Sequence, residues 1–136
     1  MSLFVDTSVW SLAFRRDPPD TCAQVTKLTH ALEQGDTIVT TGLVLQELLQ
    51  GFSGPKARIL ILDHFSAVPL VTPDRDDHIE AAALRNNCRR AGVQAGTIDA
   101  LIAQLCIRHS LTLLSSDRDF EYIAKHSELK VWQSPV

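Results

Sequence analysis

Four acidic residues stand where the rest of the sequence indicates buried structure. They are Asp6, Glu47, Asp99 and Asp117. Asp6 and Asp117 each follow a short apolar run, and Glu47 and Asp99 each interrupt an apolar stretch. A carboxylate beside a core is unfavourable unless it is paired, hydrogen-bonded or bound to a metal. Two carboxylates about 4 Å apart repel by roughly 4 kcal/mol even at an effective dielectric constant of about 20. If the fold gathers all four, a divalent cation is the simplest group that could hold them, which predicts metal-assisted chemistry.

The first two acids also have ordinary structural explanations. Asp6 is predicted at a strand-to-helix junction, where Asp is a common N-cap. The hydroxyl groups of Thr7 and Ser8 beside it could orient the carboxylate or bind a metal's water, or they could serve as caps themselves. Glu47 is predicted to be helical, and it could lie at the margin of an apolar stripe and reach water. Both explanations stay open beside the metal hypothesis.

The last two acids have structural explanations of the same kind. Asp99 falls in the first turn of a helix predicted to begin near Thr97, where the helix dipole favours an acid. That helix is largely apolar, so Asp99 is expected to be partly buried. Asp117 is a candidate N-cap, and Asp119 could take the same place, so the fourth position stays open between these two. A shared site is favoured because the same placement recurs four times: each acid lies at the end of a strand or on the inward face of a helix.

Short apolar strands alternate with helices along the chain, which is typical of a parallel α/β sheet. The predicted strands are 3–5, 37–40, 67–71, 111–114 and 129–132. The predicted longer helices are about 21–34, 42–50, 55–64, 73–90, 97–109 and 117–126. Thr72 is the predicted N-cap of the helix that starts at Pro73. A turn is predicted at 17–20. Pro69 would make the strand at 67–71 an edge strand or an irregular one. Sites of such sheets lie beyond the carboxyl ends of the strands, which is where Asp6 and Asp117 are placed.

The composition fits one domain over residues 1–136 with a packed core, since 45% of the residues are hydrophobic and 21% are charged. The three cysteines are far apart, which argues against a structural zinc site. No apolar run approaches the roughly 20 residues that span a bilayer. The N-terminus lacks the basic leader of a secretory signal, so a cytoplasmic protein without membrane contact is expected.

The net charge of −3 would by itself argue against a nucleic-acid substrate. Setting aside the four acids leaves the rest of the chain at +1, so an RNA or DNA substrate stays open. Arg89 and Arg90 precede the helix that carries Asp99, and either is a candidate contact for a phosphate group. Arg85 belongs to the same predicted helix and is expected on its solvated face.

Four segments, taken in order, resemble the PIN-domain nucleases, and among these the VapC-type toxins of bacterial and archaeal toxin–antitoxin pairs. The segments are LFVDTSVW, VLQELLQG, RRAGVQAGTIDALIAQLCIRH and LTLLSSDRDFEYIAKHSEL. They extend over essentially the whole chain, and the ordered set is specific where a single segment would be weak. The resemblance implies an α/β fold, a three-layer α/β/α sandwich around a short central parallel sheet.

The resemblance also implies an endoribonuclease that depends on Mg²⁺ or Mn²⁺. The family's acidic quartet corresponds to Asp6, Glu47, Asp99 and Asp117, with Ser8, Ser115 and Asp119 as candidate supporting residues. We expect Asp6 and Asp99 to contact the metal most directly, while the other two acids act through water or deprotonate the nucleophile. A homodimer and a cognate antitoxin partner are implied as well.

Two other functions stay open from the sequence. A receiver-like phosphoacceptor domain is also α/β with an acidic Mg²⁺ site, but it would need paired acids after the first strand and a lysine after a late strand. Here Asp6 stands alone and Lys125 falls inside a predicted helix. The second alternative is a catalytically inactive PIN-like module that binds RNA or protein, against which the intact acidic set argues.

Overall fold

A short parallel sheet forms the centre of the molecule, which is represented by a computed structural model describing residues 1–15 and 22–135. Its strands are β1 (Ser2–Val5), β2 (Thr37–Val39), β3 (Thr112–Leu114) and β4 (Lys130–Val131). The order across the sheet is β2-β1-β3-β4, and every neighbouring pair is parallel. The predicted parallel α/β sheet is therefore confirmed.

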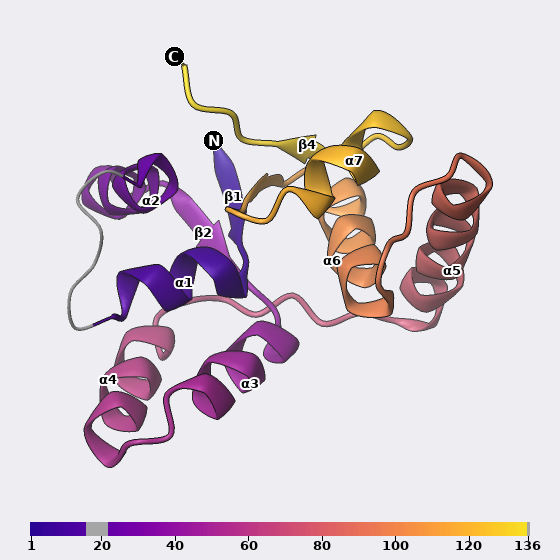
Figure 1. Cartoon of the computed structure of the whole chain (residues 1–136). Coiled ribbons are helices and arrows are strands. Elements are labelled where there is room, and N and C mark those ends of the chain that lie inside the picture. The colour runs from indigo at the N-terminus through magenta and orange to yellow at the C-terminus, as the bar shows by residue number, and fades with distance from the viewer. Residues whose placement is uncertain (16–21, 136) are drawn as a thin grey trace.

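Two groups of helices cover the sheet, as Figure 1 shows. The helices are α1 (Thr7–Ala13), α2 (Ala23–Gln34), α3 (Gly42–Gly51), α4 (Pro55–Phe65), α5 (Arg75–Arg90), α6 (Thr97–Arg108) and α7 (Asp119–Lys125). On one side α1 packs against α2 and α3, and α3 packs against α4; on the other side α6 packs against α5, α7 and β3. This arrangement confirms the predicted three-layer α/β/α sandwich.

The predicted strand at 67–71 is wrong. The segment makes only one isolated parallel bridge, between Thr40 and Leu70. The backbone N–H of Thr40 donates to the carbonyl of Pro69 at 3.1 Å, and the N–H of Val71 donates back to Thr40 at 2.7 Å. Pro69 has no N–H of its own, so the ladder cannot continue through it. The expectation that Pro69 makes this segment irregular is correct.

The start of α5 also differs from the prediction. Its N-cap is Asp74 rather than Thr72, because the Asp74 side chain accepts from the N–H of Asp77 while the Asp77 side chain accepts from the N–H of Asp74. This reciprocal capping box satisfies two backbone donors at once. Thr72 could not form one, because the residue three positions later is Arg75, whose side chain has no acceptor. The predicted turn at 17–20 and the predicted helix start at Thr21 lie outside the described residues.

The core is built around β1, whose Leu3, Phe4 and Val5 side chains are fully buried. Trp10 of α1 packs beneath the end of this strand, and its indole N–H donates to the carbonyl of Val5 at 3.1 Å. Phe65 of α4 lies against Trp10 with 4.8 Å between the ring centroids. These contacts fix the point where β1 passes into α1, and that point carries Asp6.

Among the described residues, no helix combines the length and the apolarity that crossing a bilayer requires.

Candidate metal centre

All four acids singled out from the sequence line one cleft of about 430 Å³. Asp6 follows β1 and Asp117 follows β3, and these two strands are neighbours in the sheet with Val5 paired to Leu114. Glu47 reaches the cleft from α3 and Asp99 from the first turn of α6. The carboxyl ends of parallel strands meet at one edge, which is why residues so distant in sequence converge there.

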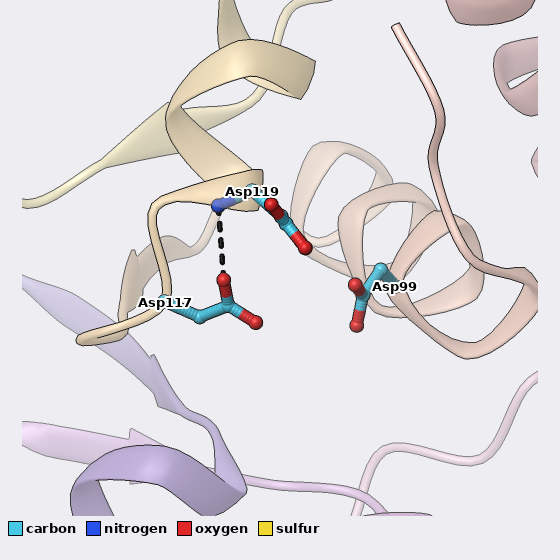
Figure 2. Close-up of side chains that lie close together, drawn as sticks. All are labelled: Asp99, Asp117 and Asp119. Atoms are coloured by element: carbon cyan, nitrogen blue, oxygen red, sulfur yellow. Dashed lines mark hydrogen bonds between the residues drawn. The ribbon is translucent and has the colours of Figure 1, made fainter.

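Two of these carboxylates form a tight cluster with a third, Asp119, which is not part of the cleft lining. Asp99, Asp117 and Asp119 each place one carboxylate oxygen so that the three atoms lie within 4.8 Å of one another. Figure 2 shows the side chains of Asp117 and Asp119 facing Asp99 across the gap between α7 and α6. The N–H of Asp119 donates to Oδ1 of Asp117 at 2.9 Å, which fixes both residues at the start of α7. Both candidates for the fourth acid therefore lie beside Asp99.

The Asp6 carboxylate is held on both sides by hydroxyl groups. Ser8 Oγ donates to its Oδ1 at 2.5 Å, and Ser115 Oγ donates to its Oδ2 at 2.7 Å. Asp6 also caps α1, since Oδ1 accepts from the N–H of Ser8 at 3.1 Å. The capping explanation is therefore correct, and it holds together with the place of Asp6 in the cleft. Burial raises the pKa of Asp6 although the hydrogen bonds from Ser8 and Ser115 oppose the rise.

Ser115 links the ends of two strands. Besides donating to Asp6, its Oγ accepts from the N–H of Asp117 at 3.0 Å. The N–H of Ser116 donates in turn to Ser8 Oγ at 3.0 Å. The loop after β3 is thus fastened to the loop after β1 by side chains that also orient Asp6.

Glu47 is oriented by Thr7, a contact that the sequence did not predict. Thr7 Oγ1 donates to Glu47 Oε1 at 2.9 Å across the packing of α1 on α3. The hydroxyl of Thr7 stands beside Asp6 in the sequence, but its hydrogen-bond partner is a residue forty positions away. The only sequence signal for a positioning role of Thr7 is its place next to an acid at the end of a strand.

The pKa of Asp99 is raised by its burial and by the other carboxylates around it. Burial, followed by repulsion from the four other carboxylates, raises its pKa to about 6. A carboxylate whose protonated form is favoured in this way becomes fully ionised when a cation offsets the surrounding negative charge. The arrangement therefore favours binding of a positive ion.

The two arginines proposed as phosphate contacts differ in their surroundings. Arg89 lines a second cleft that adjoins the first, together with Arg85 of the same helix. Arg90 instead donates to Oδ1 of Asn87 at 2.7 Å on the exposed face of α5. Arg85 was expected on the solvated face, but it is half-buried and its Nε donates to the carbonyl of Ala95 at 2.9 Å.

Comparison with known proteins follows the same lines. The PIN domain family matches residues 3–126. The chain belongs to the PIN-domain family. This PIN domain is 29% identical over 130 residues to VapC ribonuclease Mb1587 of Mycobacterium bovis and to ribonuclease VapC11 of Mycobacterium tuberculosis. In both cases the match includes 94% of this chain and 96% of the relative, and the resemblance to VapC-type proteins is confirmed.

Solved structures show the same PIN fold. The crystal structure of VapBC2 from Rickettsia felis, bound to a DNA fragment from their promoter, contains a chain that superposes with a TM-score of 0.75. The match extends over 98% of this chain and 100% of that one, at 22% sequence identity. At 22% sequence identity, this similarity shows that the two chains share a fold.

The residues of the cleft fit the divalent metal that such a fold implies. Every charged donor in the tight cluster is a carboxylate oxygen, and hard divalent cations such as Mg²⁺ and Mn²⁺ prefer oxygen ligands. Zinc sites with sulfur and nitrogen ligands need cysteine or histidine, which the cleft lining does not include among the described residues. Asp99, Asp117 and Asp119 are the residues best placed to hold such an ion.

Proposed function

We propose that this PIN domain is a metal-dependent endoribonuclease, the toxin of a VapC-type toxin–antitoxin pair, which hydrolyses RNA phosphodiester bonds at its carboxylate cleft. The observation that carries the proposal is the convergence of Asp6, Glu47, Asp99 and Asp117 on one cleft at the carboxyl ends of β1 and β3. The ribonuclease names of the relatives that match nearly the whole chain support the same activity.

We assign the residues of the cleft to distinct tasks. Asp99, with Asp117 and Asp119, would hold Mg²⁺ or Mn²⁺, and Asp6 would complete the ligand set from the other side of the cleft. When bound, the ion supplies Lewis-acid polarisation of the phosphate and a more acidic water. Ser8 and Ser115 keep the Asp6 carboxylate in one orientation, as partners of metal ligands commonly do.

Glu47 is the residue that we assign to proton transfer. Thr7 donates to its Oε1 and thereby restricts the orientation of the carboxylate. Oε2 would accept the proton of the attacking water, which requires hydrogen-bond reach but no direct contact with the phosphate. The sequence-derived expectation that Glu47 acts through water is retained in this assignment.

The remaining parts of the proposal concern the protein's setting. We propose one domain over residues 1–136 that works in the cytoplasm as a homodimer and is restrained by a cognate antitoxin protein. The solved VapBC2 structure supports the antitoxin partner, because VapBC2 names an assembly of which this fold is one part. A catalytically inactive PIN-like module is the alternative that the activity test separates from the proposal.

The test is cleavage of RNA by the purified protein. With Mg²⁺ or Mn²⁺ we expect RNA fragments, and with EDTA we expect intact RNA. Asp6→Asn and Asp99→Asn should each lose more than about 100-fold in rate, since even partners of metal ligands contribute roughly 10–100-fold. Asp63→Asn on α4 makes the same chemical change outside the cleft and should retain activity. Cleavage that persists in EDTA or in both cleft variants would overturn the proposal, and folded but inactive wild-type protein would indicate the inactive module.

A further inference from the structure

A second cleft, of about 520 Å³, adjoins the carboxylate cleft at Gly96. It lies between the C-terminal half of α5 and the loop that leads into α6. Its lining is Arg85, Arg89, Gly92, Val93, Gln94, Ala95 and Gly96. Among the described residues, this lining contains two arginines and no carboxylate. A negatively charged hollow thus borders a positively charged one at Gly96.

We propose that this second cleft receives the phosphate group of the nucleotide next to the scissile bond, with Arg85 and Arg89 as its cationic contacts. The inference rests on the proposed ribonuclease function. An RNA strand that places one phosphate at the carboxylates must leave the cleft across one edge. The next phosphate along the strand then lies at that edge, where a cation would stabilise it. Guanidinium groups match phosphate oxygens with paired N–H donors.

Gly96 marks the border between the two clefts. It is the N-cap of α6 and lines both clefts. A Cβ atom added at this position would lie 3.8 Å from Oδ2 of Asp99, so the missing side chain would project toward the carboxylates. A strand can therefore approach the backbone closely at this point, as is common where glycine borders a ligand.

Arg85 is partly fixed before any ligand binds. Its Nε donates to the carbonyl of Ala95, which fastens the loop before α6 to α5. A guanidinium has five N–H donors, so the others stay available for an anion. Arg89 lies one helical turn further along α5 and lines the same cleft from the exposed side.

Another route out of the carboxylate cleft is chemically less suited to a phosphate. A third cleft shares Thr97 and Ile98 with it. Arg85 and His78 also line this third cleft, but it lacks Arg89 and most of its lining is apolar, with Leu43 and Leu101 among the contributors. A largely apolar wall suits a base or a protein side chain better than a hydrated phosphate anion. The strand path over Gly96 is therefore the one that the charges favour.

Arg89→Ala is the sharpest variant, because Arg85→Ala would release the loop as well as remove the charge. The probe is a labelled single-stranded RNA 12-mer of mixed sequence, with binding measured by anisotropy in Ca²⁺ and cleavage measured in Mn²⁺. Arg89→Ala should weaken binding roughly tenfold, the loss expected for one charge-assisted contact. The slope of log affinity against log salt concentration should fall by about 0.7, the value for one phosphate of a single strand. Mn²⁺ binding should be unchanged.

Arg75→Ala removes an exposed arginine at the other end of α5 and is the matched control for charge. It should leave affinity and salt slope unchanged. Arg90→Ala should lose clearly less than Arg89→Ala, because Arg90 is bonded to Asn87 instead. Equal losses in Arg89→Ala and Arg90→Ala, or no loss in Arg89→Ala, would overturn the subsite. RNA that binds through Arg89 but is never cleaved would retain the subsite and reject the proposed ribonuclease, so the two failures are distinguishable.

Discussion

Hydrogen bonds from hydroxyl groups orient two of the acids in the cleft. Asp6 has both oxygens engaged by serines, and Glu47 has one oxygen engaged by Thr7. Asp99, by contrast, faces carboxylates whose repulsion adds to the effect of burial. At the scale of single residues, Asp6 and Glu47 are therefore oriented in advance, while Asp99 is a group whose charge state responds to a bound cation.

The charge state of Asp99 predicts an unusual effect of pH on the metal-free protein. Its folded pKa of about 6 lies above the ordinary value of 3.8, so folding takes up a proton between these pH values. The group's contribution to stability is then present at low pH and is lost as the pH rises through about 6. In EDTA at about pH 7.5, Asp99→Asn should unfold at a higher temperature than the wild type.

Thermal unfolding at several pH values in EDTA checks this expectation. The difference between Asp99→Asn and the wild type should shrink as the pH falls toward about 4, where Asp99 is neutral in the folded state. Asp63→Asn, on the exposed face of α4, should show no such trend. If Asp99→Asn is less stable than the wild type across the whole range, repulsion in the cleft is not the dominant effect.

At the scale of elements, two arginine side chains connect α5 and α6, one reaching from α5 toward α6 and the other from α6 back to α5. Arg85 of α5 reaches the loop before α6, and Arg108 at the end of α6 reaches back to Asp77 in the first turn of α5. Asp77 is 1% exposed, and one of its oxygens has no partner among the described residues. Because α6 carries Asp99, the two connections set where that carboxylate lies.

Arg108→Ala should therefore destabilise the protein by about 2–3 kcal/mol, because it leaves the buried Asp77 carboxylate short of a charged donor. Burial alone would raise the pKa of Asp77, but hydrogen bonds from the Asp74 backbone and from Arg108 hold it below its usual value. The contribution is thus present above about pH 4 and is lost as the pH falls through the depressed pKa. Urea unfolding at neutral and acid pH measures both effects.

Arg75→Ala is the matched control for Arg108→Ala, since it removes an exposed arginine from the same helix pair. Its effect should stay within about 0.5 kcal/mol at either pH. A loss for Arg108→Ala that is the same at neutral and acid pH would mean that packing of the side chain, and not its charge, carries the contribution.

The sequence predicted the elements well where local signals dominate. Gly35 ends α2 with a left-handed backbone conformation of φ 71°, as its position after the helix indicates. The prediction failed where two local signals compete, as at Thr72 and Asp74, both good caps. Only the reciprocal bonding between Asp74 and Asp77 decides the start of α5. Pro69 similarly interrupts a run that is otherwise rich in strand-forming residues.

At the scale of the whole molecule, the parallel sheet order explains why the acids could be found from sequence. Adjacent parallel strands must end at the same edge, so acids after β1 and β3 are brought together by topology alone. The side-chain contacts that orient them, such as Thr7 to Glu47, join different helices and leave no local signal. The second cleft escaped prediction for the same reason, because Arg85 and Gly96 meet only when α5 packs on α6.

The concentration of negative charge at one edge predicts that divalent cations stabilise the whole fold. Mn²⁺ or Mg²⁺ that binds the folded cleft at a hundred times its Kd should add about 2.7 kcal/mol. For a chain of 136 residues this raises the Tm by roughly 9 °C. NaCl at matched ionic strength should give a much smaller rise, because it screens the carboxylates without being held by them. A double variant, Asp99→Asn with Asp117→Asn, should lose the shift while Asp63→Asn keeps it. Calorimetry that finds the same shift in the double variant would locate the bound ion away from the cleft.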